Sequence, residues 1–357
     1  MSRIISMPGK FVMGNGEISR LAQYISDYGS PLILVAHRDD ANRVRDSLDR
    51  VREDGAELIE SDFTGEATRG EAERIGRICT ANDCKAVVGL GGGKAIDTAK
   101  LIAHENKLPA VIVPTIASND APCSKLAVLY HEDHVYSETV TLPLNPDLVV
   151  VDTGVIARAP ERFLVAGIGD AFATYYEGRA CMRSGAKNSH DGLATQAAFS
   201  LAELCNDILL RDGAKAVRSC RANLVTEALE NVIEANILLS GIGFESVGLA
   251  VAHAISAGFT LLPETRSSMH GETVAIGTLV QLILENLSDD EFSGVLDFYR
   301  SVGLPTCLND IGITEATEEK LRTMASAILS PRSCIHNMPF KLDEDKVYNA
   351  LAYIDLL

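Results

Sequence analysis

Several features that would place this chain in other classes of protein are missing from its 357 residues. No apolar run reaches the length needed to span a membrane, and residues 1–5 lack the apolar core of a secretory signal. The eight cysteines are scattered and include no Cys-x-x-Cys pair. A chain of this size needs no disulfide framework, so we expect reduced thiols and a cytoplasmic protein without a membrane partner.

Basic residues are also scarce relative to acidic ones. The chain has 32 Lys and Arg against 49 Asp and Glu, which gives a formal net charge of −17 at pH 7. Because a phosphate backbone requires a basic patch, this charge disfavours nucleic acid as a partner. It does not exclude one bound dinucleotide, since backbone N–H groups can hold a diphosphate. The hydrophobic fraction of 46% and the charged fraction of 23% are those of a globular chain, long enough for two domains.

The first part of the chain alternates between two patterns. Short runs rich in Val, Ile and Leu, predicted as strands, occupy residues 32–36, 86–90, 110–113 and 148–151. Amphipathic stretches, predicted as helices, occupy residues 19–27, 41–53 and 69–82. This alternation predicts an α/β domain over residues 1–160, with a mostly parallel sheet covered on both faces. Ligands of such sheets bind beyond the carboxyl ends of the strands.

The sequence pattern changes from about residue 161 onward. Long Ala- and Leu-rich helical patterns dominate, for example over residues 192–206, 224–240 and 247–259, and no strand pattern follows residue 151. We therefore expect an all-helical second domain over residues 161–357. A cleft between two such domains is the default place for a substrate.

A glycine cluster at residues 89–93 joins a predicted strand to a predicted helix. Glycine lets a phosphate approach the backbone closely, and the first N–H groups of a helix are unpaired donors. The segment is therefore a candidate diphosphate cradle. Its spacing matches neither Gly-x-Gly-x-x-Gly nor the Gly-x-x-x-x-Gly-Lys-Ser/Thr loop, because Val88 and Ala95 stand at two of the required positions. The alternative interpretation is a purely structural strand-to-helix turn.

Three polar side chains stand out in the helical half: Asp170, His253 and His270. One Asp and two His can supply three ligands to a divalent metal and leave an open position for a substrate. Each residue also has an ordinary structural interpretation. A His in an apolar helix can be a hydrogen-bonded core residue, an Asp after Gly-Ile-Gly can cap a helix, and a His before Gly can lie in a loop.

The segment over residues 113–124 follows a predicted strand and is rich in turn formers and hydroxyl groups. Its side chains could hydrogen-bond a nicotinamide amide, a ribose or a polyol. The alternative is a capped loop between two elements.

Nine short motifs, in order along nearly the whole chain, resemble those of glycerol dehydrogenases within the iron-containing (group III, metal-dependent) alcohol dehydrogenases. They are residues 8–11 (PGKF), 89–94 (GLGGGK), 97–100 (DTAK), 114–118 (PTIAS), 145–147 (NPD), 167–171 (GIGDA), 243–246 (GFES), 270–272 (HGE) and 335–337 (IHN). The resemblance implies a dehydroquinate synthase-like, Rossmann-related dinucleotide-binding domain followed by a helical metal- and substrate-binding domain. The implied activity is hydride transfer between a small polyol, of the glycerol or dihydroxyacetone type, and NAD.

The resemblance also assigns roles to particular residues. The metal ligands fall on Asp170, His253 and His270, with zinc expected and iron as the alternative, and known members tend to form homo-oligomers. Asp120, which would orient a second hydroxyl or relay a proton, and the ligand His270 are the expected catalytic residues. The implied cofactor contacts are Gly91, Gly92, Gly93, Lys94, Asp97, Thr115, Ser118, Ser124, Leu126 and Tyr130.

Two departures from the family pattern bear on this assignment. Where the family commonly has an Asp that binds the adenosine ribose, this chain has His37 followed by Arg38, so NADP is an alternative cofactor. The helix after the first His ligand has Ser256 and Ala257 where relatives often have His and Asn. Two other functions therefore stay open: a dehydrogenase of a 2-hydroxy acid or another small diol, and a non-catalytic protein that binds nucleotide and metal.

Overall fold

The computed structural model describes residues 1–133 and 135–357. Its chain divides into two compact units. The unit that we call the α/β unit comprises Met7–Pro160 and Ser219–Ile237, and the helical unit comprises Met1–Ser6, Glu161–Arg218 and Leu238–Leu357. Residues 219–237 thus group with the α/β unit, and residues 1–6 with the helical unit, whereas the sequence predicts domains of residues 1–160 and 161–357.

In the described part of the α/β unit, six strands form one parallel sheet in the order β1-β8-β5-β4-β2-β3. The strands are β1 (Phe11–Gly14), β2 (Leu32–Ala36), β3 (Leu58–Asp62), β4 (Ala86–Gly91), β5 (Ala110–Pro114) and β8 (Leu148–Asp152). Every residue of β2, β4, β5 and β8 is buried. Continuous burial is what a parallel sheet with both faces covered requires, so the predicted fold class is confirmed.

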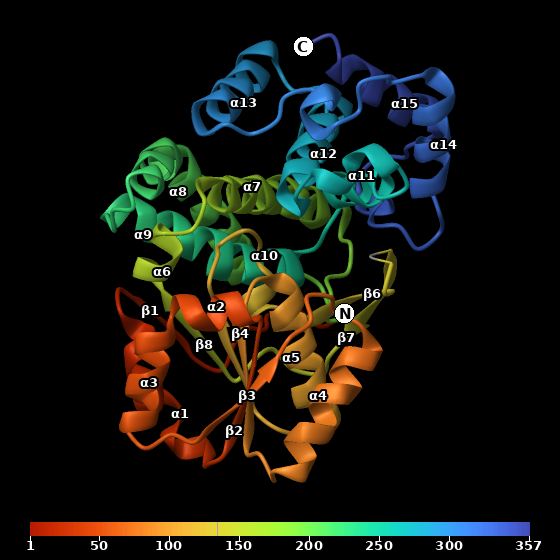
Figure 1. Cartoon of the computed structure of the whole chain (residues 1–357). Coiled ribbons are helices and arrows are strands. Elements are labelled where there is room, and N and C mark those ends of the chain that lie inside the picture. The colour runs from red at the N-terminus through yellow and green to blue at the C-terminus, as the bar shows by residue number, and fades with distance from the viewer. Residues whose placement is uncertain (134) are drawn as a thin grey trace. The chain divides into compact units, whose positions relative to one another are not determined.

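Helices cover both faces of this sheet (Figure 1). Side chains of α1 (Leu21–Ile25) and α3 (Arg45–Glu53) join the strand side chains of one face in a single apolar core. The other face is covered by α4 (Arg69–Ala81) and α5 (Gly93–Asn106). Gly89 allows α5 to lie close to β4, because a Cβ atom at that position would be 2.6 Å from the Cβ of Ala99.

The remaining elements of the α/β unit are short. They include α2 (Arg38–Arg43), the antiparallel pair β6 (Leu126–Tyr130) and β7 (Tyr136–Thr141), α6 (Thr153–Ala157) and α9 (Glu227–Glu234). The prediction of a single helix over residues 41–53 is wrong in one respect. The backbone leaves the helical region at Val44 (φ −115°, ψ 20°), so this stretch belongs to two helices, α2 and α3.

The described residues of the helical unit form helices and no named strand. The helices are α7 (Glu161–Ser184), most of α8 (Gln196–Arg221), α10 (Ser240–Val247), α11 (Val251–Phe259), α12 (His270–Leu284), α13 (Asp289–Val302), α14 (Glu318–Ile328) and α15 (Glu344–Ile354). The helix predicted over residues 247–259 begins only at Val251, because Gly248 takes a φ of +131° and ends α10. Likewise the pattern over 224–240 divides into α9, a π-helical turn (Ala235–Leu239) and the start of α10.

Within the described residues, none of the helices is by itself both long and apolar enough to cross a membrane. The stretches Glu227–Val247 and Val251–Phe259 meet that criterion only when joined, across a bend of 103°.

Candidate functional site

Three side chains from three helices meet in the helical unit. Asp170 lies on α7, His253 on α11, and His270 is the first residue of α12. One ligand atom from each lies within 4.8 Å of the other two. The Nε2 atoms of His253 and His270 are 3.4 Å and 3.3 Å from Asp170 Oδ1. The structure therefore brings together the residues that the sequence suggested as metal ligands.

Close approach of the helix backbones produces this convergence. A Cβ atom at Gly271 would lie 1.7 Å from the carbonyl oxygen of Ala166 on α7. A Cβ atom at Gly277 would lie 2.2 Å from the carbonyl oxygen of Ala252 on α11. Only glycine at these two positions lets α12 rest directly on both neighbours, which carries the His270 ring to Asp170 and His253.

The carboxylate of Asp170 is almost fully buried, with 1% of the residue exposed, and neither of its oxygens has a hydrogen-bond partner among the residues that the structure describes. Burial alone would raise the pKa of this carboxyl, but the neighbouring imidazoles of His270 and His253 hold it well below its usual range. An isolated buried carboxylate is costly. Two imidazole nitrogens and one carboxylate oxygen form a donor set that suits Zn²⁺ or Fe²⁺, so the residues fit the implied ion.

A fourth residue, Glu177, belongs to this site although sequence reasoning missed it. Its side chain is fully buried on α7, and its Oε2 lies 2.6 Å from His253 Nδ1. Burial would lower the pKa of His253, but Glu177 and Asp170 raise it well above its ordinary value. One signal was available: Glu177 follows Asp170 by two helical turns and therefore shares its helix face.

The glycine turn of the α/β unit forms the second candidate site. Gly91 ends β4 with a φ of +148°, and Gly92 occupies the N-cap position of α5. Because Gly92 has no capping side chain, the first N–H groups of α5 have no side-chain acceptor at the cap. These donors and the positive end of a 14-residue helix can receive an anion such as a diphosphate.

Two predicted cofactor residues beside the turn have protein partners. Lys94 Nζ lies 2.7 Å from Glu66 Oε2 and 4.9 Å from the centre of the Tyr130 ring. Asp97 is buried, with its carboxylate 2.8 Å from Lys100 Nζ and accepting a hydrogen bond from the backbone N–H of Val128. These contacts give Asp97 a structural role, and its contact with a cofactor stays a prediction. Burial raises the pKa of Tyr130 to about 12.

The other predicted residues of this unit lie on β6 and in the loop after β5. The Thr115 hydroxyl donates to Asp40 Oδ1 at 3.1 Å, and Ser124 Oγ accepts from the backbone N–H of Leu126 at 3.3 Å. Ser118 is half-buried, and Asp120 precedes a 3₁₀ turn over Ala121–Cys123. Asp40, which the sequence reasoning did not select, lies beside Gly91.

Comparisons with known proteins identify the family of this chain. The family model for iron-containing alcohol dehydrogenases matches residues 8–153. A glycerol dehydrogenase of Pseudomonas putida is 44% identical over 361 residues, which cover 100% of this chain and 98% of that relative. The chain belongs to the iron-containing alcohol dehydrogenase family.

Solved structures support the family assignment. A probable glycerol dehydrogenase from Sinorhizobium meliloti 1021 is 41% identical, with a TM-score of 0.92 over 99% of both chains. A glycerol dehydrogenase from Schizosaccharomyces pombe is 37% identical, with a TM-score of 0.96 over 99% of this chain and 91% of that chain.

The end of β2 differs from the family pattern described above. His37 lies at the N-cap of α2, where its Nδ1 accepts from the backbone N–H of Asp39 at 3.2 Å. Arg38 forms a 3.5 Å ion pair with Asp62. Since β2 and β4 are parallel neighbours in register, His37 and the glycine turn follow the carboxyl ends of adjacent strands. The strand order reverses between these two strands, which is where ligands of open α/β sheets bind.

The second departure from the family, on α11, contributes to helix packing. Ser256 is buried, and its hydroxyl pairs with Thr273 Oγ1 on α12 at 2.7 Å. Ala257, in contrast, is exposed. The hydroxyl at position 256 therefore joins the two helices that carry the histidines.

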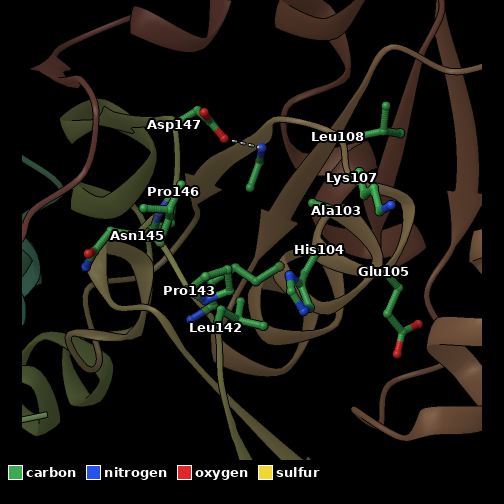
Figure 2. Close-up of a pocket in the computed structure, with 13 residues that line it drawn as sticks. Ala103, His104, Glu105, Lys107, Leu108, Leu142, Pro143, Asn145, Pro146 and Asp147 are labelled. Carbon is green, nitrogen blue, oxygen red and sulfur yellow. Dashed lines mark hydrogen bonds between the residues drawn. The ribbon is translucent and has the colours of Figure 1, made fainter. Parts of the chain in front are cut away.

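A cavity of about 520 Å³ lies elsewhere in the α/β unit, between the end of α5 and the segment over residues 142–147 (Figure 2). Figure 2 shows the Asp147 carboxylate directed at a backbone nitrogen, that of Ala110, whose N–H donates to it at 2.8 Å. None of the predicted site residues lines this cavity.

Proposed function

We propose that this protein is a metal-dependent oxidoreductase that transfers hydride between a small polyol, of the glycerol or dihydroxyacetone type, and a nicotinamide dinucleotide. The observation that carries the proposal is the meeting of Asp170, His253 and His270. The central carboxylate, that of Asp170, is buried and has no hydrogen-bond partner in the described part of the chain. Full-length similarity to a glycerol dehydrogenase supports the polyol as substrate.

Asp170, His253 and His270 would hold the divalent ion, and we propose zinc because two imidazoles and a carboxylate suit it. When bound, such an ion supplies Lewis-acid polarisation of the substrate hydroxyl. The protein's own contribution is to hold the three donors on rigid helices and to keep Asp170 ionised.

The α/β unit would bind the dinucleotide. The N–H groups at the start of α5 would receive the diphosphate, and the Gly91 turn leaves room for it. Thr115 and Ser118 would contribute hydroxyl donors, and Asp120 would orient a second hydroxyl of the polyol. We propose NAD as the cofactor, with NADP as the alternative that His37 and Arg38 would favour. Assembly into a homo-oligomer stays a prediction from the resemblance, and a cytoplasmic location stays a prediction from the scattered cysteines.

The test is a substrate screen combined with elemental analysis of the purified protein. We expect about one divalent ion per chain. We also expect oxidation of glycerol or 1,2-propanediol that is lost on chelation and restored by Zn²⁺. The screen includes 2-hydroxy acids and is run with NAD and with NADP. Preference for a 2-hydroxy acid would make that acid, and not the polyol, the assigned substrate. Nucleotide binding without any turnover would favour a non-catalytic protein.

A further inference from the structure

Glu177 is a fully buried carboxylate in the middle of α7. In the part of the chain that the structure describes, no Lys or Arg forms an ion pair with it or with Asp170. A buried carboxylate persists only when hydrogen bonds or a cation compensate for its desolvation. Its partners therefore show what it does.

One oxygen of Glu177 caps the helix that carries His253. The N-cap residue of α11 is Ala250, which has no capping side chain. Glu177 Oε1 accepts from the backbone N–H groups of Ala250 at 2.7 Å and His253 at 2.9 Å. Gln281 Oε1, from α12, accepts from those of Val251 and Ala252 at 3.2 Å and 3.3 Å. Side chains of two other helices thus satisfy the four N–H groups that open α11.

The other oxygen of Glu177 orients the imidazole of His253. Glu177 Oε2 lies 2.6 Å from His253 Nδ1, and an ionised carboxylate can only accept a hydrogen bond. The proton of the neutral ring is therefore on Nδ1, and the lone pair is on Nε2. That lone pair lies on the side of Asp170 Oδ1, 3.4 Å away, where a cation is the favourable partner for both atoms.

The turn before α11 is also held through its carbonyl oxygens, in part by the segment around Asn337, one of the motifs found in the sequence. The Asn337 side chain donates to the carbonyl oxygen of Leu249 at 2.7 Å, and the Cys334 thiol donates to that of Ala250 at 3.1 Å. The Cys181 thiol, from α7, also donates to Leu249 at 3.3 Å. The backbone that Glu177 caps is thus fixed at both its N–H and its C=O groups.

We propose that Glu177 is the positioning residue of the metal centre: one carboxylate oxygen fixes the start of α11, and the other fixes the His253 tautomer that presents Nε2 to the ion. The ion itself rests on the proposed function. Two buried carboxylates, Asp170 and Glu177, also balance the charge of one divalent cation next to neutral imidazoles. Removing such outer-shell partners of a metal ligand lowers metal affinity by about 10- to 100-fold.

The test compares Glu177→Gln with Gln281→Met. The amide oxygen of Glu177→Gln can keep both backbone hydrogen bonds, but its NH₂ group faces His253 Nδ1 and favours the opposite tautomer. Gln281→Met removes the side-chain oxygen that accepts from two backbone N–H groups of α11, and it leaves the contact between Glu177 and the His253 imidazole unchanged. Measured by chelator competition, Zn²⁺ affinity should fall about 10- to 100-fold in Glu177→Gln. In Gln281→Met, affinity should change less than about threefold, while the melting temperature falls.

A second measurement needs neither the Glu177 and Gln281 variants nor the metal. In metal-free wild-type protein with ¹⁵N-labelled histidine, at a pH high enough for the His253 ring to be neutral, NMR should show the single ring proton on Nδ1 and none on Nε2, assigned by the loss of the signals in His253→Gln. Absence of this Nδ1 proton would overturn the proposal. So would a Glu177→Gln variant that binds Zn²⁺ as tightly as the wild type, or at least as tightly as Gln281→Met does. If the wild type bound no Zn²⁺ or oxidised no polyol, the proposed function would fail, and the NMR result would still decide the role of Glu177.

Discussion

The two candidate sites are built in opposite ways. In the helical unit, side chains from α7, α11 and α12 provide the chemistry, and they are far apart in sequence. In the α/β unit, the candidate anion site is a contiguous turn, Gly91–Gly92–Gly93, and its donors are backbone N–H groups. Side chains around this turn, such as Lys94 and Asp97, pair with other protein groups.

This difference predicts how each site responds to substitution. The helical site should lose metal binding when one ligand or one close helix contact is changed. The glycine turn should tolerate changes in the side chains around it, because its donors belong to the backbone. Each of the following experiments tests one side of that comparison, beginning with the largest expected effect.

Replacing a ligand should have the largest effect. His253→Ala removes one of three donors, and Lewis-acid assistance is worth several kcal/mol, so kcat/KM for glycerol should fall by about 1000-fold or more. Elemental analysis should find little bound metal, while fluorescence titration should give an NADH affinity within about twofold of the wild type. Normal turnover in this variant would show that His253 is not a ligand of the catalytic metal.

Adding one carbon at the helix contact should disrupt the same site indirectly. In Gly271→Ala, the new Cβ would lie 1.7 Å from the carbonyl oxygen of Ala166, so α12 must move away from α7. We expect a destabilisation of about 3 kcal/mol, near the upper end for overpacking, together with weaker metal binding. Gly294→Ala is the matched control, because a Cβ there has no neighbour within 4 Å. Equal melting temperatures and equal metal contents in the two variants would contradict the close-contact account.

Asp97→Asn tests the side chains around the glycine turn. Lys100 would remain buried after its partner loses its charge, although the carbonyl oxygens of Ala121 and Ser124 still accept from it. We expect the free energy of unfolding to fall by about 2 kcal/mol, below the usual cost of an unpaired buried charge. Dinucleotide affinity of the folded protein should be unchanged. A large loss of affinity at unchanged stability would instead make Asp97 a cofactor contact.

His37→Asp should give the smallest effect. A carboxylate after β2 suits ribose hydroxyls and repels a 2′-phosphate, so the ratio of kcat/KM with NADP to that with NAD should fall about tenfold. Steady-state kinetics with both cofactors measure this ratio. An unchanged ratio would show that His37 does not face the adenosine ribose.

Elements whose structure depends only on residues adjacent in the chain could be predicted from the sequence. Strands β2, β4, β5 and β8 are continuous apolar runs, so they were predicted with ends within about one residue. Strand β3 was missed because its last three residues are polar, and only Ser61 is buried. The glycine turn was found because strand, glycines and helix are adjacent in the chain.

The helical site could be inferred only in part. Asp170, His253 and His270 were plausible ligands as residue types, but their spacing carried no metal motif, and the resemblance to a family selected them. Glu177 was missed because a Glu within a helix usually faces solvent. Its burial follows from the position of α11, and contacts between distant helices cannot be derived from periodicity along one of them.

The most direct test of the central claim is anomalous X-ray diffraction at the zinc edge, from crystals of the protein loaded with one equivalent of Zn²⁺. The account predicts one strong peak, about 2.0–2.2 Å from an Asp170 carboxylate oxygen and from Nε2 of both His253 and His270. No peak there, or a peak coordinated by other residues, would contradict it.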